Sequence, residues 1–231
     1  MTASPSSNLS MSSNGIDTSE FDPSLVSEDT KQQMRRDLGI GEDDFVFLFV
    51  GRIVNDKGIN ELVSAFNIMS EEFDNIRLVL VGGIKDDDPI TVKTKELIES
   101  NDSIISVGTQ RNVVSFYAIS DVFVFPSYRE GFPNVVLEAS AMELPSIVTD
   151  INGSNEIIED GSNGIIVPVK NSKAILDAMI QIYTTDGMIK DLKANTRQRI
   201  KKLYEREFVR DELLNEYNKM LGIKTNNTTN D

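Results

Sequence analysis

The chain has 231 residues and contains no cysteine, histidine or tryptophan. These absences exclude a disulfide, a zinc site with Cys or His ligands, and nucleophilic catalysis by a Ser-His-Asp or Cys-His set within the chain. The net charge of −14 opposes nonspecific nucleic-acid binding, although a local cluster of cations can still hold a small phosphate ligand.

The two ends of the chain are polar and poor in large apolar residues. Residues 1–20 are rich in Ser, Thr and Asn, and the last residues read KTNNTTND. Such segments bury too little apolar surface to offset the entropy that they lose on ordering. We therefore expect flexible tails at 1–20 and 222–231, with one folded domain between them at 21–221.

Within this domain, short apolar runs alternate with segments of helical periodicity. The predicted strands are 45–50, 76–82, 103–108, 121–126, 145–150 and 164–169. The predicted helices are 58–69, 92–100, 113–120, 135–142, 172–183, 188–203 and 206–221. This alternation predicts an α/β fold, a Rossmann-like parallel sheet of about six strands with helices on both faces. Because such sheets bind ligands beyond the carboxyl ends of their strands, the residues that follow each strand are the informative ones.

The loop after the first strand combines two glycines with two cations. Gly51 and Gly58 permit tight turns, and Arg52 and Lys57 lie near the start of the next helix. Cations beside a helix N-terminus favour a diphosphate site, and the alternative for this loop alone is a solvated loop. The chain contains neither a Walker A loop nor a G-x-G-x-x-G fingerprint after a strand.

The loop after the fourth strand carries two carboxylates. Glu130 lies in the loop, and Glu138 lies about one turn into a helix that starts near Asn134, a favourable N-cap residue. The two acceptor oxygens of a carboxylate at the position of Glu138 suit a diol such as ribose. The alternative is an exposed helical residue, but Leu137 and Ala139 make this helix largely apolar, and a glutamate there needs a partner.

Two further loops are less informative. The acidic run 86–88 after the second strand is interpreted as a solvated loop rather than a calcium site. The segment 149–156 after the fifth strand predicts a short helix with Ser154 as its N-cap. Capping alone and a role in a binding site are equally consistent with this second segment.

Six segments occur in a characteristic order along the chain. They are NGID-x-x-x-F at 14–21, GR-x-x-x-x-KG at 51–58, DVFVFPS at 121–127, EGFPNVVLEA at 130–139, GSNE at 153–156 and DG-x-NG-x-x-V-P at 160–168. The chain thereby resembles the C-terminal nucleotide-sugar-binding domain of the family 4 retaining glycosyltransferases, which have the two-domain GT-B fold. The E-x7-E element with GFP inside it is the most specific of these matches.

This resemblance implies transfer of a sugar from a nucleoside-diphosphate sugar to a glycan or lipid-linked acceptor. It implies catalytic roles for Arg52, Lys57 and Glu130. The donor-binding residues that it implies are Gly51, Thr109, Gly131, Phe132, Pro133, Asn134, Val135 and Glu138. It implies no metal and no cofactor other than the nucleotide sugar as co-substrate, and it assigns no general base.

One departure from the family concerns the position of the NGID segment. In the family this segment lies at the hinge between two domains, near mid-chain, whereas here it begins at Asn14. We therefore expect the segment before residue 21 to be a hinge remnant and the chain to form one half of a GT-B fold. Because the N-terminal acceptor domain is missing, we expect the chain to bind the donor without transferring the sugar. The alternative is a non-catalytic module of the same fold that binds a nucleotide or sugar phosphate. A nucleotide-sugar epimerase is opposed by the absence of a Tyr-x-x-x-Lys motif.

The closing helices are basic. Eight Lys or Arg and three acids lie between Lys190 and Arg210. This charge favours either a polar face docked on its own domain, the preferred interpretation, or peripheral contact with the inner face of a membrane. No apolar run approaches the ~20 residues that span a bilayer, and the N-terminus does not resemble a signal peptide, so we expect a cytoplasmic protein.

Overall fold

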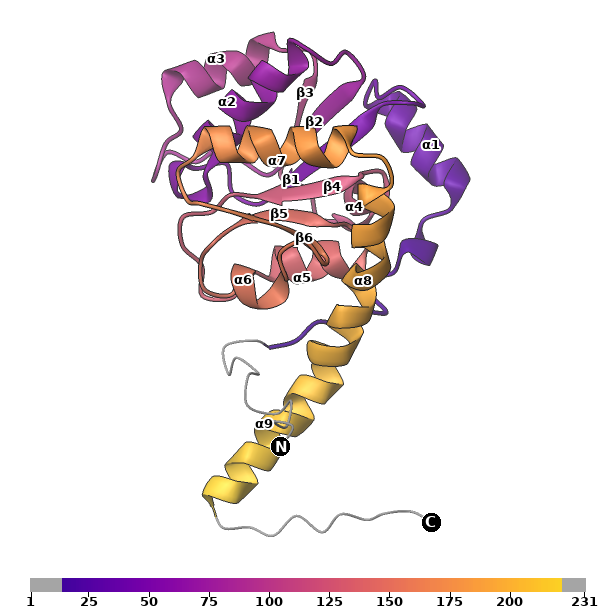
Figure 1. Ribbon diagram of the computed structural model, residues 1–231, viewed down its shortest axis with the longest axis vertical. Helices are drawn as coiled ribbons and strands as arrows, with labels where there is room; N and C mark the ends of the chain where they lie inside the picture. The colour runs from indigo at the N-terminus through magenta and orange to yellow at the C-terminus, as the bar shows by residue number, and fades with distance from the viewer. Residues whose placement is uncertain (1–13, 222–231) are drawn as a thin grey trace.

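The computed structural model describes residues 14–221, which form a parallel sheet covered by helices on both faces (Figure 1). The strands are β1 (Phe45–Val50), β2 (Ile76–Val81), β3 (Ile104–Gly108), β4 (Val122–Phe125), β5 (Ser146–Thr149) and β6 (Gly164–Val167). Their order in the sheet is β3-β2-β1-β4-β5-β6, and all neighbours pair in parallel. The predicted α/β fold class is confirmed, because each strand coincides with a predicted one to within two residues at either end.

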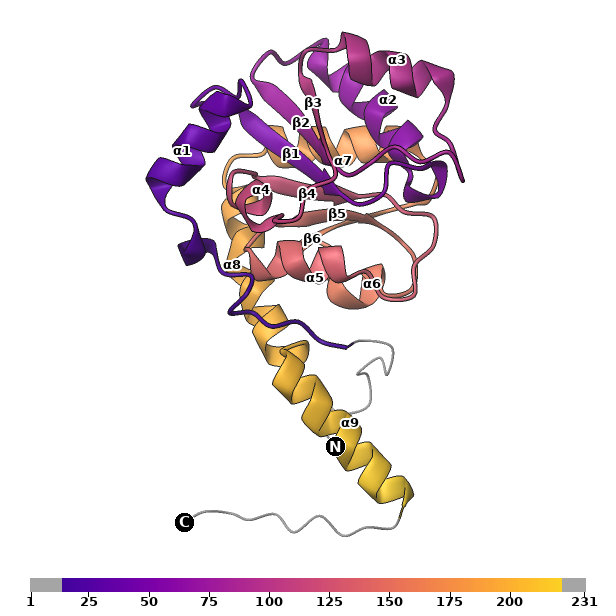
Figure 2. The ribbon, with the colours of Figure 1, turned by 180° about the vertical axis from the view of Figure 1, so that it is seen from behind.

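The helices form two layers around this sheet. They are α1 (Glu28–Asp37), α2 (Ile59–Ser70), α3 (Val92–Ser100), α4 (Val114–Ala118), α5 (Asn134–Ala141), α6 (Ser154–Ile157), α7 (Ser172–Thr184), α8 (Met188–Leu203) and α9 (Arg206–Met220). Short 3-10 helices occupy Pro23–Leu25 and Asn55–Lys57. Helices α2, α3 and α7 cover one face, and α4, α5 and α6 cover the other, as the two opposite views show (Figures 1 and 2).

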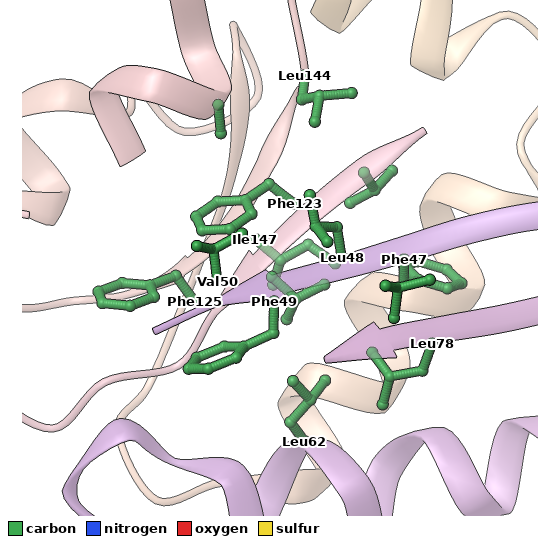
Figure 3. Packing of buried hydrophobic residues seen from close by; sticks show 14 of the residues in the cluster. Phe47, Leu48, Phe49, Val50, Leu62, Leu78, Phe123, Phe125, Leu144 and Ile147 are labelled. Carbon is green, nitrogen blue, oxygen red and sulfur yellow. The ribbon is translucent and has the colours of Figure 1, made fainter. Parts of the chain in front are cut away.

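The core is built on the two central strands. Phe47 and Phe49 of β1 and Phe123 of β4 are completely buried. Figure 3 shows these aromatic side chains between Leu62 on α2 and Leu144 ahead of β5. A strand buried on both faces needs apolar residues without alternation, which explains why FVFLFV is a continuous apolar run.

Two glycines allow the loops at the carboxyl edge of the sheet to approach one another. A Cβ atom at Gly58 would lie 2.1 Å from the carbonyl oxygen of Pro126, and one at Gly82 would lie 1.7 Å from that of Gly51. Both distances are far below van der Waals contact, so no larger residue fits without moving the backbone. The loops after β1, β2 and β4 therefore meet at this edge because these positions carry no side chain.

Helix α1 is absent from the sequence-based prediction because it has no apolar stripe. None of its residues is buried. Local signals specify it instead: the Ser27 hydroxyl accepts a hydrogen bond from the Thr30 N–H at 3.2 Å, and Glu28 and Arg36 complement the two ends of the helix dipole.

The structure also differs from the expected N-terminal tail at residues 14–20. Ile16 forms a parallel bridge to Glu205, its N–H donates to the Tyr204 carbonyl at 2.8 Å, and the Thr18 hydroxyl donates to the Glu205 carboxylate at 2.6 Å. Backbone pairing to the α8–α9 junction thus orders this segment, although its polar composition predicts flexibility. The remaining tail predictions, at 1–13 and 222–231, lie outside the described residues.

Part of the basic character of α8 is used within the domain. Arg197 donates to the carbonyls of Thr18, Phe21 and Ala141, and Arg199 pairs with Glu159 at 2.9 Å. These contacts support the interpretation of a docked face. Helix α9 extends away from the sheet (Figures 1 and 2), and no helix within residues 14–221 is long and apolar enough to cross a membrane.

Candidate functional site

The candidate site lies where the strand order of the sheet reverses. Successive connections run from β1 outward to β3 and then return to β4 on the other side of β1. The loops that leave β1 and β4 therefore diverge and open a crevice at the carboxyl edge, the usual ligand position in such sheets. The Tyr128 N–H donates to the Asp56 carbonyl at 2.8 Å and ties these two loops together.

Lys57 and Glu130 form an ion pair across this crevice. The Lys57 Nζ lies 2.5 Å from Glu130 Oε1, and the two side chains are 15% and 18% exposed. The Ser127 hydroxyl, which is completely buried, donates to the same carboxylate oxygen at 3.0 Å. The structure thus brings together two of the three predicted catalytic residues and holds Glu130 in a fixed orientation.

The N-terminus of α5 lies beside this pair. Pro133 occupies the cap position, and no side chain caps the helix. Asn134 is exposed as the first helical residue, so its prediction as a capping residue is wrong. The backbone N–H groups of Asn134 and Val135 have no acceptor among residues 14–221. An uncapped helix start with free N–H groups suits a bound anion.

Glu138 lies one turn into α5 and contacts a tyrosine. The Tyr117 hydroxyl, completely buried on α4, donates to Glu138 Oε2 at 2.9 Å. Burial raises the pKa of the Glu138 carboxyl, and the hydrogen bond from Tyr117 only partly offsets this. Burial, followed by the adjacent Glu138 charge, raises the pKa of the Tyr117 phenol well above its ordinary value. The sequence indicated that Glu138 needs a partner, and the structure supplies a neutral donor rather than a cation.

Arg52 forms a separate ion pair. Its guanidinium lies 2.9 Å from Asp87 in the loop after β2, and both side chains are more than half exposed. It lines a cavity of about 550 Å³ with Asp56, Tyr128 and Lys170. The structure therefore does not place Arg52 at the Lys57–Glu130 pair, because a nearer carboxylate in the acidic loop binds it.

The acidic run is largely exposed, as the sequence indicated, because Asp86 and Asp87 are exposed and Asp88 is half-buried. The Asp88 carboxylate accepts a hydrogen bond from the Asp56 N–H at 2.6 Å, and Asp87 binds Arg52. Two of its three acids thus also hold the loop after β1.

The remaining predicted donor-binding residues lie in the loops around the crevice. Gly51 directly follows β1, and its carbonyl oxygen lies 1.7 Å from the position that a Cβ atom of Gly82 would occupy. Thr109 is exposed after β3, and its hydroxyl lies 2.9 Å from the position that a Cβ atom of Gly83 would occupy. These residues lie on the β2–β3 side of the reversal.

The residues between Glu130 and Glu138 form the other wall. Gly131 is exposed, Pro133 is buried, and Val135 is half-buried. The Phe132 ring lies 5.7 Å from that of Tyr204. A Cβ atom at Gly153 would lie 2.8 Å from the Pro133 ring, so the loop after β5 supports this wall directly.

The predicted cap of the short helix α6 is also corrected. Gly153 is the N-cap and Ser154 the first helical residue, while the Glu156 carboxylate accepts a hydrogen bond from the Gly153 N–H at 3.2 Å. Gly153 has φ of +80°, a conformation that disfavours a serine at the same position.

Sequence reasoning missed Tyr117 and Ser127 as parts of the site. Tyr117 is one of several apolar residues in a short helix and therefore resembles an ordinary core aromatic. The available signal was its hydroxyl, because a buried tyrosine, unlike a phenylalanine, needs a hydrogen-bond partner. Ser127 immediately follows β4, where a buried hydroxyl also requires a partner.

A second cavity, of about 470 Å³, lies at the opposite edge of the sheet. Its lining includes Arg35, Asp121 and Lys193. Arg35 donates to the carbonyls of Ile119, Gly41 and Asp44, and Asp121 accepts from the Val46 N–H. Arg35 and Asp121 thus hold the backbone at the amino ends of the strands, so we assign these two side chains a structural role.

No group of three or more acidic side chains within residues 14–221 is arranged to hold a metal ion. The metal independence implied by the family resemblance stays a prediction.

Comparisons with known proteins agree with this geometry. The family model described as "Glycosyl transferases group 1" matches residues 30–199. The capsular polysaccharide biosynthesis glycosyltransferase CapM of Staphylococcus aureus is 31% identical over 210 residues, which cover 91% of this chain and 54% of CapM. The chain thus spans about half the length of the curated relatives that it matches.

Solved structures show the same fold. The C-terminal domain of the glycosyl transferase group 1 protein LpcC from Francisella tularensis is 26% identical with a TM-score of 0.71, covering 83% of this chain and 99% of that domain. Anabaena HepE, solved in complex with UDP-glucose, is 17% identical with a TM-score of 0.78, covering 89% of this chain and 56% of HepE. The extent of the family match and the identity to CapM lead to one conclusion: the chain belongs to the glycosyl transferases group 1 family.

Proposed function

We propose that this chain is the donor-binding domain of a retaining glycosyltransferase and that it binds a nucleoside-diphosphate sugar. The observation that carries the proposal is the arrangement at the switch point. There the Lys57–Glu130 pair and the Glu138 carboxylate flank a helix start whose first N–H groups are free. A cation and an anion site thus lie beside acceptors for hydroxyl groups. A nucleoside-diphosphate sugar requires this combination, because it carries two phosphates between a ribose and a second sugar.

Each part of the donor has a matching part of the site. The diphosphate binds Lys57 and the N–H groups of Asn134 and Val135, and Arg52 joins it after leaving Asp87. The ribose hydroxyls bind Glu138. The base lies toward Thr109, and the backbone of residues 131–133 supports the sugar and phosphate.

The Lys57–Glu130 pair also suggests how binding prepares the sugar. When the diphosphate takes Lys57 as its counterion, Glu130 is released to accept hydrogen bonds from the transferred sugar. As the bond to the sugar breaks, negative charge grows on the departing diphosphate, and the cations and N–H groups are already positioned to stabilise it. We propose that this replaces a divalent metal, and no side chain is assigned as general base.

The acceptor and the whole reaction depend on the rest of the longer proteins that the chain resembles. CapM is named for capsular polysaccharide biosynthesis, and HepE was solved with UDP-glucose. These names support a UDP-sugar donor and a glycan acceptor, and the lipid-linked acceptor implied by the family resemblance stays a prediction. Transfer would require an acceptor domain in addition to the domain described here.

Isothermal titration calorimetry with UDP, GDP and ADP tests the proposal. We expect weak binding of at least one of them and no sugar transfer to simple acceptors. Glu138→Ala should weaken binding by about 1.5–3 kcal/mol, roughly tenfold to a hundredfold, because the ribose loses a charged acceptor. Glu99→Ala, on the exposed face of α3, is the matched control and should bind like the wild type. Binding of none of the three, or equal binding by Glu138→Ala, would remove the site assignment.

A further inference from the structure

A completely buried phenol contacts the carboxylate that we assign to the ribose. Tyr117 packs its ring edge-on against Phe123 at 5.9 Å and Phe21 at 6.4 Å. Its hydroxyl donates to Glu138 Oε2 at 2.9 Å and lies 3.4 Å from the carbonyl oxygen of Val135. Since both partners belong to α5, the hydroxyl fixes the first turn of this helix as well as the carboxylate.

Among residues 14–221 the carboxylate has no other partner. No lysine or arginine within residues 14–221 forms an ion pair with Glu138, and Oε1 accepts no hydrogen bond from these residues. A half-buried carboxylate held by one neutral donor is unfavourable for stability alone, because burial penalises the charge and nothing of opposite sign compensates for it. One oxygen is therefore fixed, and the other is left available.

We propose that Tyr117 is the positioning residue of Glu138: it holds Oε2 so that Oε1 faces the hydroxyls of the donor's ribose. This inference rests on the proposed function and adds a residue that does not itself touch the donor. The rigid ring restricts the carboxylate to one orientation before binding. Binding then costs less free energy, because the Glu138 side chain is already ordered before the ligand arrives.

The acceptor strength of the carboxylate depends on the same hydrogen bond. The bond favours the ionised form of Glu138, and burial disfavours it. Tyr117 on α4 is the titratable group that faces this carboxylate from the elements packed against it in the described part of the chain. Loss of the hydroxyl should therefore raise the pKa of Glu138 further. As the pH falls, the carboxylate is then protonated at a higher pH than in the wild type, and ligand binding weakens at that higher pH.

The test compares Tyr117→Phe with Tyr183→Phe in the full chain. Tyr183, on α7, is the matched control because its hydroxyl also donates to a side chain, Asn75 Oδ1 at 2.6 Å, but at the amino edge of the sheet. Carbon-13 NMR of the Glu138 carboxyl, without ligand, should show a raised pKa in Tyr117→Phe and no change in Tyr183→Phe. An unchanged pKa in Tyr117→Phe would overturn the proposal, whether or not the chain binds a nucleotide.

Calorimetry with UDP and 2′-deoxyuridine diphosphate provides the second readout. We expect the wild type to favour UDP about tenfold, and Tyr117→Phe to lose most of this preference. If both ligands weaken equally and the preference persists, Tyr117 has only a structural role. If neither ligand binds the wild type, and GDP with its 2′-deoxy analogue also fails to bind, the proposed function fails, and the carboxyl titration then decides the Tyr117–Glu138 relation separately.

Discussion

At the scale of single residues, Glu138 shows a conflict between stability and the proposed function. Its carboxylate is half-buried, and burial raises its pKa above the ordinary value of 4.5, although the hydrogen bond from Tyr117 partly offsets this rise. Such a group destabilises the folded state when it ionises. The proposed function accounts for its presence, because the carboxylate would accept hydrogen bonds from the ribose hydroxyls, whereas an uncharged residue of the same shape would stabilise the fold better.

Glu138→Gln should therefore stabilise the ligand-free protein at neutral pH. A carboxyl with a raised folded-state pKa makes the protein less stable as the pH rises from 4.5 through the raised value. We expect a gain in the free energy of unfolding of about 0.5–2 kcal/mol at neutral pH, and little change at about pH 3, where both residues are neutral. Urea denaturation at the two pH values measures this difference. A gain of equal size at both would contradict the role of ionisation.

In the proposed complex, Asp87 would compete with the donor phosphates for Arg52. Because the Arg52–Asp87 pair is exposed, its own contribution to stability is small, about 0–1 kcal/mol. Asp87→Asn should free the guanidinium and raise the affinity for a nucleoside diphosphate by about twofold to fivefold at low ionic strength. Asp86→Asn makes the same change of charge one residue away and is the control. Equal gains in calorimetry for both variants would show that only net charge matters.

At the scale of elements, the site depends on loops that touch without side chains between them. Gly58 lies between β1 and α2 and contacts the residue that follows β4. Loss of this contact would separate the Lys57 loop from the Glu130 loop. A glycine is required there for space as well as for its backbone conformation.

Gly58→Ala separates these two requirements when it is compared with Gly39→Ala. Both glycines have φ of +69°, but the added Cβ meets the Pro126 carbonyl at 2.1 Å in the first and nothing within 4 Å in the second. We expect a loss of about 1 kcal/mol for Gly39→Ala from backbone strain alone. For Gly58→Ala we expect more than about 3 kcal/mol, or failure to fold. Similar thermal denaturation midpoints for the two variants would refute the packing argument.

The sheet could be predicted from the sequence because both of its faces are covered. Continuous apolar runs such as 45–50 and 121–126 leave little choice of structure once helical segments separate them. Helix α1 could not be predicted in this way, because it buries no residue and depends on capping and charge. The N-caps of α5 and α6 are Pro133 and Gly153, one residue before the predicted Asn134 and Ser154. They differ because backbone conformation, rather than cap propensity, decides where these two helices begin.

The candidate site could be predicted only in part. The pairing of Lys57 with Glu130 follows from the meeting of the loops after β1 and β4, which the fold class implies. The partner of Glu138 could not be deduced, because nothing in the spacing shows that the Tyr117 hydroxyl reaches α5. The direction of Arg52 depends on a loop, 86–88, whose course after β2 has no local sequence signal.

At the scale of the whole molecule, the two edges of the sheet differ in what their polar groups contact. The carboxyl edge carries the Lys57–Glu130 ion pair, and there the N–H groups of Asn134 and Val135 and one oxygen of Glu138 have no partner among residues 14–221. The amino edge has a cavity whose polar side chains mostly hold the backbone. The segment 14–22 and α8 are joined through Arg197, so the beginning of the described chain packs against its second-to-last helix.

The most direct test of the central claim is to map by NMR where a nucleoside diphosphate binds. With UDP added to the isotope-labelled chain, or GDP if UDP does not bind, we predict the largest amide shifts at residues 51–58, at 109 and from 130 to 138. Arg35 and Lys193, at the amino edge, should not shift. Shifts centred on those two residues, or saturation without shifts from 130 to 138, would contradict a donor site at the switch point.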